Sequence, residues 1–197
     1  DTRVSYGGED RLGETFGAEG TGTGPQAWQG QVTLQGRGNR GDARWTGYPL
    51  TVTVYAAGDT TPLRSEGVVL DGQGVFTAQS LAGGSYDIEV EGRHSLCNQR
   101  LGVAMPAAES IYLGTMLEGD ANDDEKVDIL DFSLLATAFG GRVGDGRYNP
   151  MTDFNDDGKV DILDFSLLAT NFNRRGCVEV TGNMGASGAM EAKPVAA

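Results

Sequence analysis

The chain has 197 residues, 39% of them hydrophobic, and a formal net charge of −13. This length fits one or two domains with a modest core, and no apolar run of about 18 residues predicts a membrane span. The acidic balance argues against nucleic-acid binding, because phosphate contacts require a basic face. The 31 glycines favour turns, strands and Gly-rich ends over a helical bundle.

Residues 1–27 are predicted to form a Gly-rich N-terminal arm. Seven glycines lie between Gly7 and Gly24, mixed with Ser and Thr, which is typical of a linker without its own core. One alternating segment, Arg3–Tyr6, is a candidate strand. An extended arm that also buries Leu12 and Phe16 is able to add a strand to the sheet edge of a neighbouring subunit. This motivates the hypothesis of a homopolymer.

Residues 28–117 are predicted to form an antiparallel β-sandwich. Short runs of alternating or β-branched residues are separated by turn signals such as Asp71-Gly72 and Ala82-Gly83-Gly84. Seven short strands at this spacing are typical of a sandwich. The seven runs are Trp28–Leu34, Leu50–Tyr55, Gly67–Leu70, Val75–Ala78, Tyr86–Val90, Gln99–Val103 and Ile111–Leu117. The stretches 71–76 and 81–90 resemble the carboxypeptidase-regulatory-like family of sandwiches.

An internal repeat with an offset of 33 residues follows the sandwich. The segments Val127–Thr137 and Val160–Thr170 are identical, and an acidic loop precedes each of them. Between Glu118 and Asp164 there are 13 acidic and 4 basic residues, so this region carries −9 of the net charge. The repeat therefore holds most of the acidic excess.

The spacing of the acidic residues predicts two calcium sites. Oxygen-bearing side chains occupy loop positions 1, 3, 5, 9 and 12, and position 7 offers its main-chain carbonyl, as in an EF-hand loop. The expected ligands of the first ion are Asp120, Asn122, Asp124, Lys126, Asp128 and Asp131. The expected ligands of the second ion are Asp153, Asn155, Asp157, Lys159, Asp161 and Asp164. The alternative is two acidic surface turns in front of unrelated helices.

The two loops differ from a standard EF-hand in their surroundings. Gly158 occupies position 6 of the second loop, where the chain turns sharply, but Glu125 stands there in the first loop and is expected to cost some strain. Helical periodicity predicts helices over Val127–Phe139 and Val160–Phe172. The segment before the first loop reads as a strand. Each unit is therefore a loop followed by one helix, and both loops end in Asp.

Two loop–helix units, Asp at position 12 and the opening Gly119–Asn122 (GDAN) resemble a type I dockerin over about residues 118–173. The resemblance implies a domain that docks its helices on a cohesin, a β-sandwich partner. In that family, loop positions 10 and 11 recognise the partner; here they are Ile129, Leu130, Ile162 and Leu163. Their identity in both copies implies two binding orientations. The alternative is that these residues pack inside the dockerin-like region or on the sandwich.

Residues 174–197 are a predicted tail with one candidate strand after Cys177. The chain has two cysteines, Cys97 and Cys177, and an exported chain with two cysteines usually pairs them. The bridge would close a loop around the whole calcium-binding region. The alternative is two buried free thiols. The start at Asp1 is consistent with a processed, exported product.

Catalytic patterns are not apparent in the sequence. His94 is the single histidine, and its turn-like context predicts a solvated loop position. The alternating Asp87, Glu89 and Glu91 suggest a solvated sheet face more than a glycosidase pair, and no zinc-ligand set is recognisable. We therefore expect no enzymatic activity.

Three functions fit these predictions. The first is a secreted, calcium-stabilised building block of an extracellular assembly, such as a filament of exchanged arms or strands. The second is a cellulosome-type subunit that binds a cohesin in polysaccharide breakdown. The third is a carbohydrate-binding module with a dockerin, in which Trp28 and Trp45 would serve as sugar platforms.

Overall fold

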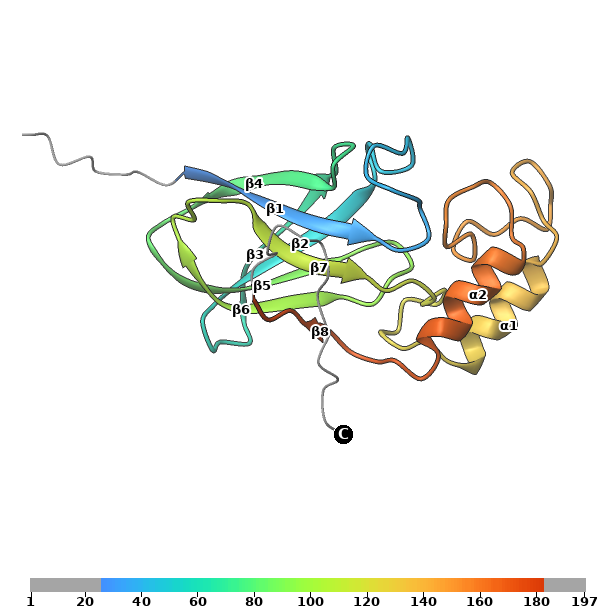
Figure 1. Ribbon diagram of the computed structural model, residues 1–197. Coiled ribbons are helices and arrows are strands. Elements are labelled where there is room, and N and C mark those ends of the chain that lie inside the picture. Colours follow the sequence, from blue (N-terminus) through green and yellow to red (C-terminus); the bar gives the residue numbers. More distant parts are fainter. Residues whose placement is uncertain (1–25, 183–197) are drawn as a thin grey trace, which may run out of the picture.

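The computed structural model describes residues 26–182. It shows a β-sandwich with a pair of helices beyond one of its ends (Figure 1). The candidate strand Arg3–Tyr6 and the apolar residues Leu12 and Phe16 lie outside the described residues, as does most of the predicted tail. The sandwich begins two residues earlier than expected, because Gln26 already belongs to the first strand.

Each of the seven predicted runs overlaps one strand of two stacked sheets. One sheet has the order β4-β1-β7, and the other has the order β3-β2-β5-β6-β8. The strands are β1 (Gln26–Leu34), β2 (Pro49–Ala56), β3 (Pro62–Val69), β4 (Val75–Leu81), β5 (Gly84–Glu91), β6 (Asn98–Met105), β7 (Ile111–Met116) and β8 (Val178–Glu179).

The prediction of a β-sandwich is confirmed, although two of its strand pairs are parallel. β1 pairs with β7 in parallel, and β6 pairs with β8 in parallel, whereas the other pairs are antiparallel. In the parallel pair, Leu34 lies opposite Met116, so both strands end at the same edge of the sandwich. The loop after β1 and the chain after β7 therefore meet where the helices attach.

The sandwich core consists of alternating inward residues from both sheets. Val52 and Val54 of β2 are fully buried, as expected for a strand with one face on the core. Trp28 and Phe76 pack edge to face with their ring centroids 5.7 Å apart. Trp28 is 4% exposed and Trp45 is 1% exposed, so the expectation that they form sugar platforms is wrong. Their large apolar surfaces stabilise the core instead.

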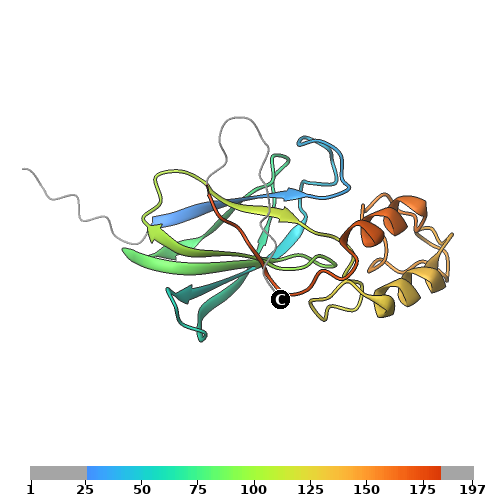
Figure 2. The same cartoon turned by 60° about the horizontal axis from the view of Figure 1, so that its bottom comes forward.

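The helices are α1 (Ile129–Ala138) and α2 (Ile162–Asn171), and they lie side by side (Figure 2). Both begin two residues later than predicted. The Asp128 side chain accepts a hydrogen bond from the Leu130 amide, and the Asp131 side chain accepts one from the Asp128 amide, which completes a capping box at the start of α1. Loop position 9 is therefore the N-cap in each repeat, and positions 10 to 12 already belong to the helix.

The two repeats are related by a pseudo-twofold arrangement of hydrogen bonds. The Val127 amide donates to the Arg174 carbonyl over 2.9 Å, and the Val160 amide donates to the Gly141 carbonyl over 2.9 Å. The acceptors are 33 residues apart, like the donors. Each loop thus pairs with the chain that leaves the other helix. Leu135 and Leu168, equivalent residues of the two helices, are buried between them.

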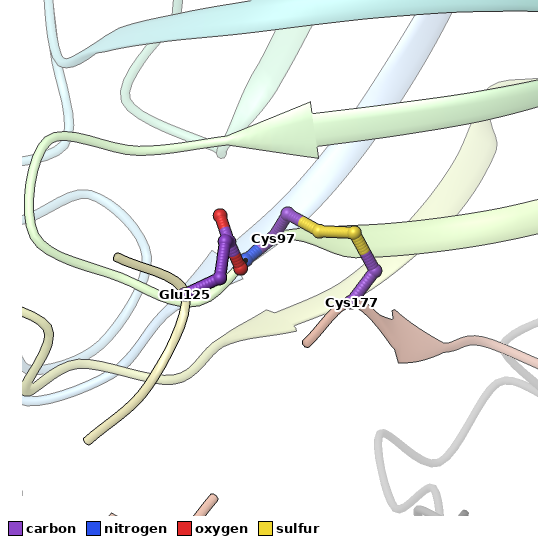
Figure 3. A group of neighbouring side chains, drawn as sticks. All are labelled: Cys97, Glu125 and Cys177. Carbon is purple, nitrogen blue, oxygen red and sulfur yellow. Dashed lines mark hydrogen bonds between the residues drawn. A yellow bond between two sulfur atoms is a disulfide. The ribbon is translucent and has the colours of Figure 1, made fainter. Parts of the chain in front are cut away.

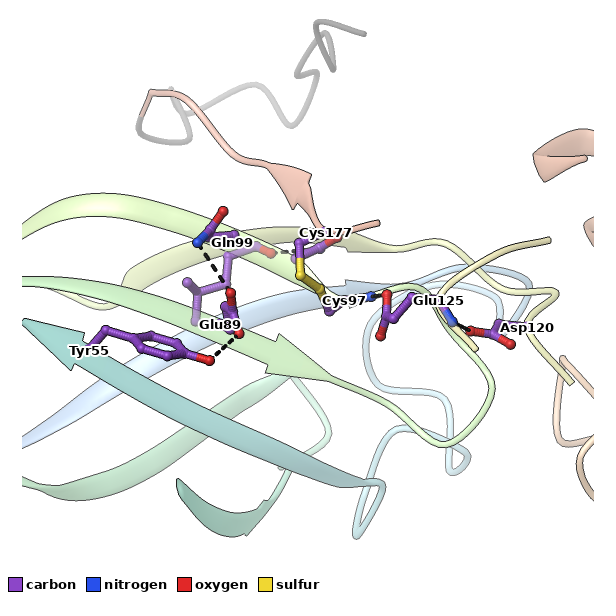
Figure 4. Close-up of a disulfide and its surroundings, with 9 residues drawn as sticks. Tyr55, Glu89, Cys97, Gln99, Asp120, Glu125 and Cys177 are labelled. Carbon is purple, nitrogen blue, oxygen red and sulfur yellow. Dashed lines mark hydrogen bonds between the residues drawn. A yellow bond between two sulfur atoms is a disulfide. The ribbon is translucent and has the colours of Figure 1, made fainter. Parts of the chain in front are cut away.

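The chain returns to the sandwich after α2. Cys97 and Cys177 form a disulfide, and the next residue, Val178, donates its amide to the Cys97 carbonyl over 2.8 Å (Figure 4). The sequence separation of the two cysteines is 80 residues. The disulfide therefore fixes the C-terminal end of the helical region beside β6, whereas its N-terminal end continues from β7 of the other sheet.

Candidate calcium loops and their junction with the sandwich

The first loop is folded around the carboxylates at positions 1 and 12. Asp120 accepts hydrogen bonds from the amides of Asp124 (3.2 Å) and Glu125 (2.8 Å). Asp131 accepts from the amides of Ala121 (2.8 Å) and Asn122 (3.2 Å). The Asp120 and Asp131 side chains are buried. These contacts curl the loop so that its acidic positions surround one small volume.

The second loop repeats this arrangement. Asp153 accepts from the amides of Asp157 (3.1 Å) and Gly158 (2.9 Å), and Asp164 accepts from the Asn155 amide (3.3 Å). One contact is additional: the Tyr148 hydroxyl donates to Asp153 over 2.8 Å. Asp153, Asn155 and Asp164 are all buried. The second loop is thus the more enclosed of the two.

The donor sets fit a hard divalent cation. Asp124 Oδ1 is buried and has no hydrogen-bond partner among residues 26–182, although buried acceptors are normally satisfied. Burial and the Asp131 carboxylate raise the pKa of Asp120 to about 6, and burial and the Asp153 carboxylate do the same for Asp164. Buried carboxylates of this kind require a compensating positive charge. A calcium ion, which takes six to eight oxygen ligands, would supply that charge.

Two residues of each loop adopt the left-handed backbone region. At position 6, Glu125 has φ 59° and Gly158 has φ 85°, which agrees with the strain expected for a side chain there. At position 4, Asp123 has φ 61° and Asp156 has φ 52°. Asp at these angles costs of order 1 kcal/mol or more, so its surroundings must hold it there.

A buried ion-pair network joins the second loop to the sandwich. Arg37, in the loop after β1, is fully buried and pairs with Glu118, which follows β7. Arg37 Nε and Nη2 lie 3.0 and 2.9 Å from Asp156 Oδ2. The Arg37 guanidinium also lies over the Tyr48 ring, 4.4 Å from its centroid. One cation thus connects the first sheet, the segment between the domains and the second loop.

His94 belongs to this network, which corrects its assignment to a solvated loop. Its side chain is 1% exposed, and Nδ1 lies 2.6 Å from Glu118 Oε2. Burial lowers the pKa of His94, but Glu118 and Asp156 outweigh burial and raise it above its ordinary value. For Asp156, burial alone would raise the pKa, but His94 and Arg37 outweigh burial and lower this pKa to about 2. His94 therefore acts as a structural contact between the two domains.

The first loop faces acidic residues of the sandwich instead. Burial, followed by the carboxylates of Glu125 and Asp123, raises the pKa of Glu91 to about 7.

Asp87, on the same strand as Glu91, is buried and accepts hydrogen bonds from the amides of Gly58 (2.8 Å) and Gly102 (2.7 Å). Asp87 therefore satisfies backbone donors, and the expectation that it lies on a solvated face is wrong.

Glu125 connects the first loop to the disulfide. Its carboxylate accepts a hydrogen bond from the Cys97 amide over 3.0 Å (Figure 3). The carboxylate and the two sulfur atoms lie within 4.8 Å of one another, a spacing that would suit a metal ion. The sulfurs are bonded to each other, however, and a disulfide provides no thiolate ligand. Glu125 therefore ties the first loop to β6.

The four residues at positions 10 and 11 lie on the open surface of the helices. Their exposed fractions are 60% for Ile129, 55% for Leu130, 60% for Ile162 and 54% for Leu163. The two pairs are thus equivalent in exposure as well as in sequence. The alternative in which they pack inside the helical region or on the sandwich is wrong.

Among residues 26–182, no helix has the length and apolarity needed to cross a membrane.

Comparison with known proteins identifies the helical region. Residues 118–173 match the sequence model of the dockerin type I domain. No curated protein sequence matches the chain. Two solved structures of a type II cohesin–X-dockerin complex from Acetivibrio cellulolyticus, an N-terminal and a C-terminal interface mutant, each contain a similar chain. In both, the TM-score is 0.57 at 21% identity over 76% of this chain and 97% of that chain.

At this identity the similarity to the solved structures establishes the fold alone. The family match, by contrast, coincides with the repeated acidic loops and their two helices, Ile129–Ala138 and Ile162–Asn171. Residues 118–173 of this chain therefore form a dockerin type I domain.

Proposed function

We propose that the protein is a secreted, non-catalytic, calcium-binding assembly subunit whose dockerin domain binds a β-sandwich partner of the cohesin class. Dockerin domains supply calcium binding and partner docking, and the rest of the described chain is a sandwich. The disulfide between Cys97 and Cys177 agrees with an oxidising, extracellular location.

A single observation carries the partner proposal. Two identical apolar pairs, Ile129-Leu130 and Ile162-Leu163, stand more than half exposed at the starts of the two helices. Large apolar side chains grouped on an exposed surface mark interaction sites more often than isolated ones do. Each pair occupies positions 10 and 11 of a candidate calcium loop, so an ion in that loop would hold its pair in a fixed orientation.

The two ions are proposed to bind at the ligand sets named above. Calorimetric titration of the full chain with calcium should give two ions per chain. Asp131→Ala and Asp164→Ala each remove the carboxylate at position 12 and should each abolish binding of one ion. A wild-type protein that takes up no calcium would contradict the proposal at its base.

The partner proposal is tested with purified cohesin domains of type I and type II, in calcium and in excess chelator. We expect binding in calcium only. Replacing both residues of one pair by Asp should preserve binding through the other pair, and replacing all four should abolish it. Leu63→Asp is a matched control, because Leu63 is 59% exposed on the sandwich. Equal loss from that control would show that the helix surface is not the docking site.

A finer form of the proposal is a homopolymer in which the arm of residues 1–27 adds a strand to a neighbouring sandwich. Sedimentation of the full chain and of a chain starting at Ala27, both in calcium, distinguishes it. Higher-order particles from the full chain alone would support arm exchange. If both chains sediment as monomers, arm exchange is excluded and the proposed function is that of a cohesin-binding subunit. The carbohydrate-binding alternative loses its two proposed platforms, because both tryptophans are in the core.

A further inference from the structure

Two arginines of the sandwich contact the second candidate calcium loop and hold it in place. Arg37 contacts the Asp156 carboxylate at 2.9–3.0 Å, and Arg44 Nη1 donates to the Asn155 carbonyl over 3.1 Å. Asp156 stands between Asn155 and Asp157, the proposed ligands at positions 3 and 5. These contacts therefore fix the segment 155–157, which carries two of the proposed ligands.

The contact of Arg37 with Asp156 is rigid because the guanidinium is buried and is contacted from several sides. The Arg37 side chain has no exposed surface, and neither has that of its partner Glu118. The Arg37 main-chain carbonyl accepts a hydrogen bond from Trp45 Nε1 over 3.1 Å, so the loop that presents Arg37 is anchored in the sandwich core. A guanidinium fork has a fixed geometry and defines where the Asp156 carboxylate sits.

The first loop offers a natural contrast. The residue equivalent to Asp156 is Asp123, which is exposed and faces the acidic Glu91. Asn122 is exposed, whereas its equivalent Asn155 is 3% exposed. The two loops thus have matching ligand sets, but only the second has position 4 held by cations.

We propose that Arg37 is a positioning residue for the second calcium site, so that a buried cation of the sandwich prepares this loop for the ion, whereas no cation of the described residues holds position 4 of the first loop. The inference rests on the proposed binding of calcium to both loops. Outer contacts that orient metal ligands typically contribute 10–100-fold to metal affinity.

The charge of Arg37 does not oppose this role. A lone guanidinium near a calcium site would repel the ion, but Arg37 is shared between the carboxylates of Glu118 and Asp156. Its charge is therefore balanced within the network. What remains is geometric: Asp156 is held in a left-handed conformation, with φ 52°, that the free loop would rarely adopt.

The test measures calcium affinity at each loop separately in the full chain. Arg37→Met is made together with Asp131→Ala, which leaves the second loop, and together with Asp164→Ala, which leaves the first. Calorimetry should show that Arg37→Met raises the dissociation constant of the second loop about tenfold or more and leaves that of the first loop within about twofold. Arg40→Met is the matched control, because it makes the same change three positions along the same loop.

A second pair of measurements separates positioning from general damage. Arg37→Met leaves Glu118 buried without its cation, so Arg37→Met with Glu118→Gln removes both charges and should show the same selective loss. Terbium luminescence excited through Tyr148 reports the second loop, since the Tyr148 hydroxyl contacts Asp153, and Tyr148→Phe, which removes the sensitising phenol, should abolish that signal. Equal weakening of both loops, or of neither, would overturn the proposal. A wild-type chain that binds no calcium would instead overturn the proposed function itself.

Discussion

The two calcium loops have nearly the same sequence and different neighbours. Phe154 follows position 1 of the second loop and packs edge to face on His94, with the ring centroids 5.6 Å apart. Its equivalent in the first loop is Ala121, which has no aromatic ring that could make this contact. The repeat thus determines the ligand chemistry of both loops. A few residues outside the repeated pattern determine which loop packs on the sandwich.

The same asymmetry continues along the helices. Asn171 at the end of α2 donates to Gln35 Oε1 over 2.7 Å and to the Glu118 carbonyl over 2.6 Å. The equivalent residue of α1 is Ala138, which is buried in the dockerin core. The second repeat is therefore attached to the sandwich by polar contacts at its loop and at the end of its helix. The first repeat is attached through Glu125, which accepts from the Cys97 amide, and through the amides of Gly119 and Asp120, which donate to the His94 carbonyl.

Removal of calcium should have the largest effect and should reveal this asymmetry. Without the ions, four carboxylates in each loop repel one another, so the binding energy appears as folding energy. Excess chelator should abolish most of the helical circular dichroism while the β signal persists. Amides of α1 should exchange hydrogen faster than those of α2, because only α2 keeps polar contacts with the sandwich.

The exchange experiment has its own control. The segments Val127–Thr137 and Val160–Thr170 are identical in sequence, so intrinsic exchange rates cancel in the comparison. Equal protection of the two helices in chelator would mean that the sandwich contacts add nothing to the second repeat. Unchanged helical dichroism in chelator would remove the link between calcium and folding.

Removal of the disulfide should have the next largest effect. Cys97→Ser with Cys177→Ser opens a loop of about 80 residues, which lowers the free energy of unfolding by about 2–4 kcal/mol. The first calcium site should weaken more than the second, because Arg174 hydrogen-bonds Val127 just before the chain reaches Cys177. Guanidinium unfolding in calcium and titration of each loop measure both quantities. A larger loss at the second loop would contradict the assigned attachments.

Much of this architecture was predictable because it is encoded locally. Alternation of residues such as Val52 and Val54 predicts strands, and the spacing of carboxylates predicts the loops. The start of each helix was misjudged by two residues, since Val127 looks helical by periodicity but pairs with Arg174 as an extended residue. A sequence pattern does not distinguish an apolar residue in a helix from one in a short bridge.

Long-range polar contacts could not be predicted. Arg37 and Glu118 are 81 residues apart, and the parallel pairing of β1 with β7 brings them together. His94 lies in a glycine- and arginine-rich stretch that suggests solvent, yet the attached domain buries it. A residue at a domain junction is buried by a surface that its own neighbourhood in the sequence does not contain. The tryptophans were misassigned for a related reason, because burial depends on the opposite sheet.

The smallest expected effect concerns the acidic contact of the first loop. Burial, Glu125 and Asp123 together raise the pKa of Glu91 from 4.5 to about 7. The folded protein therefore holds a proton on Glu91 that the unfolded chain has released between these two values. Stability from this group is fully present below about pH 4.5 and is lost as the pH rises through about 7.

Glu91→Gln removes the titration while keeping the shape of the side chain. The variant should be more stable than wild type at pH 8, by less than about 1 kcal/mol because the group is partly exposed and salt screens it. The gain should disappear near pH 5, where wild-type Glu91 is largely protonated. Thermal unfolding in calcium, which keeps the first loop folded against Glu91, measures it across this range, and Glu66→Gln, on the sandwich strand β3, is the control. A gain that persisted at pH 5 would mean that charge repulsion beside the first loop is not its cause. A gain confined to high pH would show that the sandwich disfavours the first loop electrostatically, while Arg37 and Arg44 attach it to the second.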